Sequence, residues 1–190
     1  MRSLVPVLLL VSIFTVGGCA GEDRADRGRP PSKPMAKPAV KAVPASTETA
    51  ILAGGCFWGM EELLRKIPGV VDTEAGYTAG AESVRVVFDP SVLTYATLLE
   101  RWFFRMHDPT TRNRQGNDVG EQYRSAIFYT TDGQRATAEQ VKARVAASGF
   151  WKAPLTTEIK AAGKFEPAES FHQDYLQKNP EGYTCHFIRK

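Results

Sequence analysis

The stretch LAGGCFWGMEELLRKIPG, residues 52–69, joins the end of a β-prone run to a helical pattern. Apolar residues recur at helical spacing after Cys56, and Pro68-Gly69 ends the pattern. Cys56 therefore lies at a strand-to-helix turn, where the positive end of the helix dipole favours a thiolate and should lower the thiol pKa. The local pattern fits a reactive cysteine and a buried core cysteine equally well.

Strand and helix patterns alternate along the rest of the domain. The first six expected elements run β-α-β-β-α-β, the order of a ferredoxin-like split unit. We therefore predict an α+β fold, a two-layer α/β sandwich with a ferredoxin-like core and an irregular C-terminal tail. Thr94, and either Thr131 or Asp132, should cap the two later helices. In chain order we expect a strand at 49–55, a helix at 57–67, strands at 70–77 and 82–90, a helix at 94–107, a strand at 123–130, a helix at 132–148 and a strand at 154–160.

The N-terminal residues have the pattern of a secretory signal. Arg2 precedes an apolar run, residues 4–16, that is too short for a membrane span. The following Val-Gly-Gly-Cys19 resembles the lipobox of bacterial lipoproteins, which implies that Cys19 is acylated; an ordinary cleaved signal, with Cys19 lost or free, is the alternative. We expect a signal peptide over 1–18, a Pro-rich disordered tether over 19–47 and a folded domain over 48–190.

The net positive charge comes from the N-terminal residues. The formal net charge is +3, and residues 1–47 hold seven basic and three acidic side chains, so the domain is close to neutral. A nucleic-acid surface is therefore not expected, and the basic tether suits anionic lipid headgroups. We expect a lipid-anchored protein of the bacterial cell envelope that faces the non-cytoplasmic side. The sequence has no phosphate loop, dinucleotide fingerprint or metal-ligand pattern, so no metal or other cofactor is expected.

Four blocks, in order, resemble the peptide methionine sulfoxide reductase A family. They are GGCFWGMEELLRKIPGV from residue 54, GYTAG from residue 76, RQGNDVGEQYRSAIFY from residue 114 and FHQDYLQKNPEGY from residue 171. The resemblance extends over nearly the whole chain from about Ile51. It departs from the family pattern at one place, because Gly80 runs directly into Ala81-Glu82 where family members usually carry an insert.

The resemblance implies a mechanism for this sequence. The Cys56 thiolate would attack the sulfur of methionine sulfoxide, while Glu82 donates a proton to the departing oxygen, assisted by Tyr77 and Tyr123. Methionine and a Cys56 sulfenic acid would be the products. No cofactor is implied, and we expect a monomer.

Hairpin geometry adds an independent expectation for the acid. If the hairpin closes through residues 78–81, Tyr77 and Glu82 stand directly opposite each other, with Cβ atoms roughly 5 Å apart. Ala79 suits a two-residue primed turn poorly. A carboxyl in an aromatic pocket should have its pKa raised by desolvation, as a general acid near neutral pH requires.

The resemblance also implies residues that hold the substrate and restore the thiol. Phe57 and Trp58 would enclose the methyl group, and Asp118 matches a position that helps to hold the substrate. Cys185, in GYTCHF, would resolve the sulfenic acid through a Cys56–Cys185 disulfide that a thioredoxin-like donor reopens. A structural disulfide between the same two residues is the alternative.

Other functions use the same nucleophile. His107-Asp108, His172 and His186 could support a cysteine hydrolase, but neither a protease signature nor an orienting triad is visible. His107 and His172 are better interpreted as structural hydrogen-bonding residues that border the cleft. A thiol peroxidase and a non-catalytic lipoprotein of the same fold also stay open.

Overall fold

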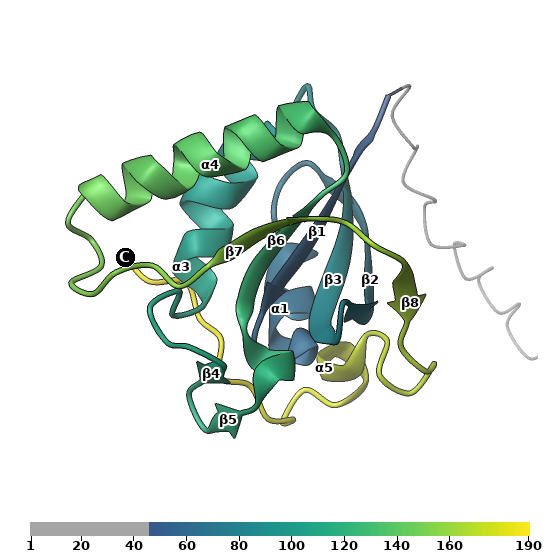
Figure 1. Cartoon of the computed structure of the whole chain (residues 1–190). Coiled ribbons are helices and arrows are strands. Elements are labelled where there is room, and N and C mark those ends of the chain that lie inside the picture. The colour runs from purple at the N-terminus through teal and green to yellow at the C-terminus, as the bar shows by residue number, and fades with distance from the viewer. Residues whose placement is uncertain (1–45) are drawn as a thin grey trace, which may run out of the picture. The chain divides into compact units, whose positions relative to one another are not determined.

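The computed structural model describes residues 46–190 (Figure 1). The predicted signal peptide, Cys19 and nearly all of the predicted tether lie outside the described residues. Within residues 46–190, no helix combines the length and apolar character that a membrane span requires. In chain order the elements are β1 (Glu48–Gly54), α1 (Phe57–Leu64), β2 (Val70–Thr78), β3 (Ala81–Phe88), α2 (Tyr95–Thr97), the π-helix η1 (Leu98–Phe103), α3 (Phe104–Met106), β4 (Arg114–Gln115), β5 (Asp118–Val119), the 3₁₀-helix η2 (Glu121–Tyr123), β6 (Ser125–Tyr129), α4 (Asp132–Ala147), β7 (Glu158–Ala161), β8 (Phe165–Pro167) and α5 (Tyr175–Lys178).

A mixed six-stranded sheet organises the domain in the order β7-β6-β1-β3-β2-β8. Its four central strands, β6-β1-β3-β2, are antiparallel throughout and follow the ferredoxin-like order. β7 adds a parallel edge beside β6, and β8 adds an antiparallel edge beside β2. The predicted α+β class and ferredoxin-like core are confirmed, and the chain after α5 has no regular element, as expected.

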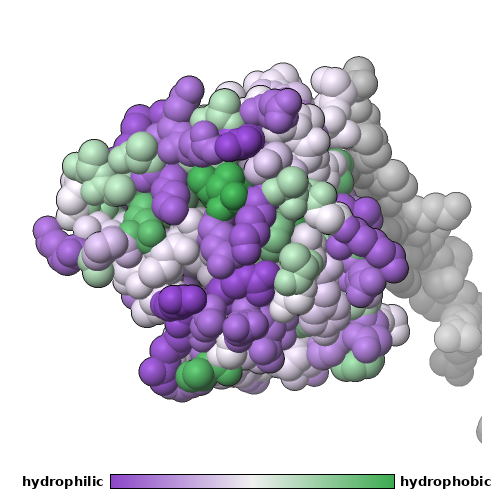
Figure 2. All heavy atoms as spheres, viewed as in Figure 1, coloured by the Kyte–Doolittle hydropathy of each residue, from purple (hydrophilic) through white to green (hydrophobic). Residues whose placement is uncertain are grey.

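The two faces of the sheet are covered differently. Leu52 and Val84 pack with α1 and the later helices in the main core. Ile51 and Phe128, on the opposite face, form a smaller cluster against Phe165. Figure 1 shows that the segment joining β7 to β8 crosses this second face, while α1 lies behind the sheet. On the outside of this face the apolar residues form small patches between polar side chains (Figure 2).

The helix predicted over residues 94–107 differs in form from the expectation. It is split into α2, η1 and α3, with a π-helical middle. Leu98 and Leu99 are fully buried, and so are Phe103 and Phe104 five positions further on. Five residues is the spacing of the i→i+5 hydrogen bonds of a π-helix. The wider π turn shifts the following side chains around the axis, so that both phenylalanines reach the core.

Both expected caps are present. The Thr94 hydroxyl accepts a hydrogen bond from the Thr97 amide at 3.1 Å. For α4 the cap is Thr131 rather than Asp132, and its hydroxyl accepts from the Gln134 amide at 3.1 Å. Each cap satisfies one of the amide groups that a helix start leaves without a partner.

Candidate active site

Cys56 occupies the turn between β1 and α1 and is the N-cap residue of the helix. Gly55 precedes it with φ 108°, and a Cβ there would lie 2.5 Å from the Gln115 side chain, so only glycine fits. Two amide groups at the start of α1 face the site. The Phe57 amide donates to Glu82 Oε2 at 3.0 Å, and the Trp58 amide lies where it lowers the pKa of the Cys56 thiol. The helix start therefore holds the acid beside the thiol.

The ionisation of Cys56 contradicts the expectation from its position. Burial raises the pKa of the thiol from 9.0 to about 12, and the Trp58 amide opposes this only in part. The negative charges of Glu82 and Asp118 raise the pKa further. The prediction of a lowered pKa was wrong because Cys56 is only 7% exposed, and desolvation of the thiolate outweighs the helix dipole.

The β2–β3 hairpin supplies the acid. Tyr77 pairs directly with Glu82, and Thr78 pairs with Ala81, so the predicted register is confirmed. The turn is a two-residue primed turn, and Ala79 takes the positive φ of 48° to which it is poorly suited. Burial raises the pKa of Glu82 from 4.5 to about 7, against the lowering effect of the Phe57 amide. The expected rise in the pKa of this carboxyl is therefore confirmed.

Two phenols share the electrostatic environment of Glu82. Tyr77 comes from β2 and Tyr123 from the end of η2, so residues 46 positions apart in the chain flank one carboxyl. Burial raises the pKa of both phenols, and the charge of Glu82 raises each further. Both hydroxyls therefore stay protonated at neutral pH and can donate hydrogen bonds in this site.

Aromatic rings enclose the other side of the turn. Phe57 is 2% exposed, and its ring centroid lies 5.5 Å from that of Tyr77 and 5.3 Å from that of His172. Trp58 stacks on Tyr175 at 3.8 Å, and its indole N–H donates to His172 Nδ1 at 3.1 Å. Phe57 is therefore part of the core as well as a neighbour of Cys56, whereas Trp58 is only partly buried.

Asp118 lies beside the second cysteine. The Cys185 thiol donates to Asp118 Oδ2 at 3.4 Å, and the Tyr183 hydroxyl donates to the same oxygen at 3.2 Å. Burial, together with Asp118, raises the pKa of Cys185 to about 11. Cys56 and Cys185 are both free thiols, and Cys185 lies close enough to raise the pKa of Cys56. The structure thus brings together all the predicted site residues of the domain in a reduced state.

Comparison with known proteins agrees with this arrangement. A family model described as peptide methionine sulfoxide reductase matches residues 48–190. The chain belongs to the peptide methionine sulfoxide reductase A family. MsrA 1 of Mesorhizobium japonicum is 56% identical over 157 residues, covering 76% of this chain and 91% of the relative. MsrA of Pseudomonas fluorescens is 54% identical over 157 residues, with 76% and 75% covered. The alignment with the Mesorhizobium japonicum protein has 157 positions but covers only 76% of the 190 residues of this chain, about 144 residues. The relative therefore has residues at about a dozen aligned positions where this chain has none.

Solved structures of the family share the fold. Reduced Mxr1 of Saccharomyces cerevisiae has a TM-score of 0.72 and 35% identity, covering 80% of this chain and 97% of that chain. Methionine sulfoxide reductase A of Corynebacterium diphtheriae has a TM-score of 0.62 and 36% identity, covering 74% and 79%. Mxr1 in complex with Trx2 has a TM-score of 0.58 and 29% identity, covering 80% and 96%.

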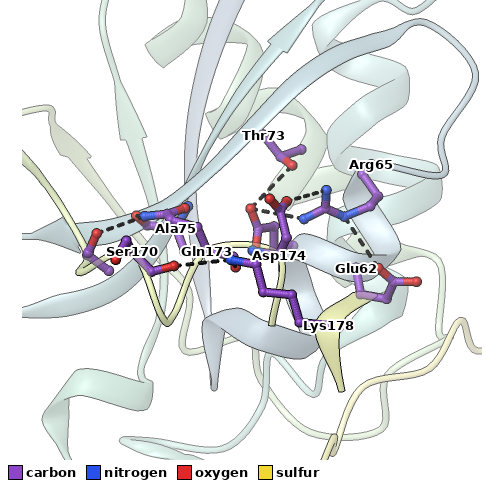
Figure 3. A network of polar contacts seen from close by, with 10 residues as sticks. Glu62, Arg65, Thr73, Ala75, Ser170, Gln173, Asp174 and Lys178 are labelled. Atoms are coloured by element: carbon purple, nitrogen blue, oxygen red, sulfur yellow. Dashed lines mark hydrogen bonds and ion pairs between the residues drawn. The ribbon is translucent and has the colours of Figure 1, made fainter. Parts of the chain in front are cut away.

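A partly buried ion network fastens the C-terminal segment of this reductase to α1 (Figure 3). Arg65 lies between the carboxylates of Glu61 and Asp174, at 3.0 Å and 2.7 Å, and the Asp174 amide donates to Glu61 at 3.0 Å. Next to it, the Gln173 amide group both donates to and accepts from the backbone of Ala75 in β2, at 2.8 Å and 2.9 Å. These bonds fix the neighbouring His172 and Tyr175, which contact Trp58.

The histidines divide as expected, with one exception. His107 is fully buried, and its nitrogens contact the Phe103 carbonyl and the Ser125 hydroxyl, both at 2.7 Å. His172 borders the site through Trp58. Both are hydrogen-bonding residues of the structure, as predicted. Sequence reasoning considered His186 only for a hydrolase and missed its contact with the Cys56 turn; its position directly after Cys185 was the available signal.

Proposed function

We propose that this protein reduces methionine S-sulfoxide, free or in proteins, to methionine, and so repairs oxidative damage. The single observation that carries the proposal is the pairing at the start of α1. A buried thiol, Cys56, adjoins a carboxyl, Glu82, whose pKa of about 7 leaves it partly protonated at neutral pH. A carboxyl of this kind can protonate a sulfoxide oxygen, which makes the sulfur easier to attack.

The first step transfers oxygen from the substrate to the enzyme. The Cys56 sulfur attacks the sulfoxide sulfur as Glu82 protonates the oxygen. The sulfur–oxygen bond of the sulfoxide breaks, and the oxygen ends on Cys56 as a sulfenic acid, while the thiol proton replaces the one that Glu82 gave up. The substrate sulfur is reduced by two electrons and Cys56 is oxidised by two.

The surrounding residues orient the substrate. Tyr77 and Tyr123, protonated beside Glu82, donate hydrogen bonds to the sulfoxide oxygen. Phe57 and Trp58 enclose the methyl group, because a small apolar group fits best against aromatic walls. Asp118 helps to hold the substrate.

The second step restores the enzyme. Cys185 attacks the sulfenic sulfur of Cys56, which gives a disulfide and water. A thioredoxin-like donor then reduces the disulfide. The contact of the Cys185 thiol with Asp118, close to Cys56, supports this role. The complex of Mxr1 with Trx2 supports the class of reductant by analogy.

Single-turnover and steady-state measurements test both steps. Cys185→Ser should reduce about one equivalent of sulfoxide and then stop with a thioredoxin donor, whereas Cys56→Ser should reduce none. Full thioredoxin-linked turnover by Cys185→Ser would remove this residue from the mechanism. Sulfoxide reduction by Cys56→Ser would show that Cys56 is not the nucleophile. If the protein is a thiol peroxidase instead, it should consume peroxide faster than sulfoxide.

We also propose that the protein is a lipoprotein of the bacterial cell envelope, facing the non-cytoplasmic side. The apolar run of residues 4–16 and the lipobox-like sequence before Cys19 support the proposal. Membrane-extracted protein should carry a lipid on Cys19 as its first residue. An unmodified, soluble N-terminus found by mass spectrometry would refute lipidation.

A further inference from the structure

The C-terminal tail is held against the catalytic turn by one buried side chain. His186 is 6% exposed although the neighbouring tail residues form no regular element. Its Nε2 lies 2.8 Å from the carbonyl oxygen of Gly54, the last residue of β1 and two positions before Cys56. A carbonyl can only accept, so Nε2 carries the proton and donates it.

This contact fixes the remaining nitrogen of the ring. Burial lowers the pKa of His186 to about 4, so the ring is neutral and Nδ1 is a free acceptor. Nδ1 lies 3.5 Å from the Cys185 sulfur and offers that thiol a second acceptor besides Asp118 Oδ2. One imidazole thus joins the end of β1 to the thiol of Cys185.

The helix beside the tail leaves room for this ring. Gly59 lies inside α1 with no left-handed φ, so its backbone does not require glycine. A Cβ at this position would lie 2.6 Å from His186 Nδ1 and would also collide with the Thr184 side chain. Glycine weakens a helix by about 1 kcal/mol relative to alanine. Its presence here is explained by the space that the tail needs.

We propose that His186 is a positioning residue that holds Cys185 at the Cys56 turn, in a recess of α1 that Gly59 leaves open. The inference rests on the proposed function, because it concerns the step in which Cys185 resolves the sulfenic acid. Asp118 bonds the side chains of Cys185 and Tyr183. Within residues 46–190, the backbone of the tail is bonded to the rest of the domain only further on, where the Arg189 amide donates to the Arg105 carbonyl. His186 is therefore the side chain that bonds the tail to the Cys56 turn itself.

His186 assists the formation of the Cys56–Cys185 disulfide, which needs no reactant other than the two cysteines. The Cys185 sulfur bonds to the Cys56 sulfur, and the sulfur–oxygen bond of the sulfenic acid breaks. The thiol proton joins the departing hydroxyl to form water. The Cys56 sulfur is reduced and the Cys185 sulfur is oxidised. Holding the two sulfurs close makes this reaction effectively unimolecular. Displacement of the tail should therefore lower the rate of disulfide formation and leave the rate of sulfoxide reduction unchanged.

Two matched substitutions of His186 test whether its bond to Gly54 holds Cys185 in position. In His186→Gln the side-chain amide can still reach the Gly54 carbonyl, whereas in His186→Asn it is too short. After one equivalent of methionine sulfoxide is added to the full chain, the Cys56–Cys185 disulfide is followed by quenched alkylation and peptide mass spectrometry. His186→Asn should form it on the order of 10²-fold more slowly than the unmodified chain, and His186→Gln within about threefold. The burst of methionine should be unchanged in both.

Gly59→Ala tests the same contact by filling the space in α1 that the His186 ring occupies. It should slow disulfide formation as His186→Asn does, although alanine favours the helix. The control is Gly133→Ala in the first turn of α4, where a Cβ would lie 3.8 Å from the nearest atom, an ordinary contact. A stable Gly59→Ala protein with slow resolution and a normal burst is the expected result.

The outcomes separate the two proposals. A normal rate of Cys56–Cys185 disulfide formation in His186→Asn and Gly59→Ala would overturn the positioning role of His186 and leave the proposed function intact. Equal slowing in His186→Gln and His186→Asn would also overturn it, because the bond to Gly54 would not be the cause. If the unmodified chain releases one equivalent of methionine but forms no Cys56–Cys185 disulfide, Cys185 is not the resolving residue, and the positioning role of His186 is overturned as well.

Discussion

The β2–β3 hairpin and the C-terminal segment after β8 approach Cys56 from different parts of the chain, and they are built on different principles. The hairpin places Tyr77 and Glu82 through backbone pairing, which depends on register and little on side-chain identity. The C-terminal segment has one four-residue helix, and side chains such as Arg65 and His186 hold it to remote groups.

The difference determines what a substitution does. In the hairpin, a changed side chain removes its own chemistry while the backbone stays in place. In the C-terminal segment, a changed side chain moves the groups that it holds. Effects on the chemical step and effects on stability should therefore separate between the two regions.

The largest expected effect is in the hairpin. Glu82→Gln keeps an oxygen that can accept from the Phe57 amide but cannot donate the proton. We expect the rate of methionine formation in a single turnover to fall about 10²-fold or more, with little change in the free energy of unfolding. A near-normal single-turnover rate would mean that another group supplies the proton.

The second prediction concerns the segment held by side chains. Arg65→Met leaves the buried Glu61 carboxyl and Asp174 without their shared partner. We expect the free energy of unfolding to fall by about 2 to 3 kcal/mol, with a raised KM because Trp58 loses the support of His172 and Tyr175. Chemical denaturation and steady-state kinetics measure the two effects.

A neighbouring lysine provides the control for that variant. Lys66 is 64% exposed and pairs with Glu62 at 2.6 Å on the same helix end. Because exposed ion pairs contribute little, Lys66→Met should change the free energy of unfolding by less than about 1 kcal/mol. Equal effects of the two variants would contradict the role of the Glu61–Arg65–Asp174 network.

The third prediction follows from the raised pKa of Glu82, from 4.5 to about 7. Only the protonated carboxyl can donate, so the active form is fully present below this pKa and is lost as pH rises through it. We expect the single-turnover rate to be flat in acid and to fall about tenfold for each pH unit above the pKa. Glu82→Gln should lack this descending limb; if it is retained there, another group titrates.

The smallest effect concerns the hairpin turn. Ala79 has φ 48°, a region that is costly for residues with a Cβ. Ala79→Gly should raise the free energy of unfolding by about 0.5 to 1 kcal/mol and leave activity unchanged. The exposed Ala136, inside α4, is the control, because its replacement by glycine should lower stability by about 1 kcal/mol. Destabilisation in both variants would mean that the turn is not strained.

The sequence by itself determined the order of the central elements, the turn that carries Cys56 and the pairing of Tyr77 with Glu82. These features depend on local periodicity, turn residues and register, which neighbouring residues encode. The family resemblance added Tyr123, Asp118 and Cys185, for which no local pattern indicates proximity.

Only the tertiary structure decided the ionisation of Cys56, the form of the helix after Thr94 and the place of the tail. The helix dipole at Cys56 is a local effect, but the desolvation that outweighs it comes from residues distant in sequence. The π-helix follows from burying Leu98 and Leu99 together with Phe103 and Phe104, five positions further on. His186 reaches Gly54 across 132 positions of the chain, and no periodicity in the sequence encodes a contact between an irregular tail and a strand end.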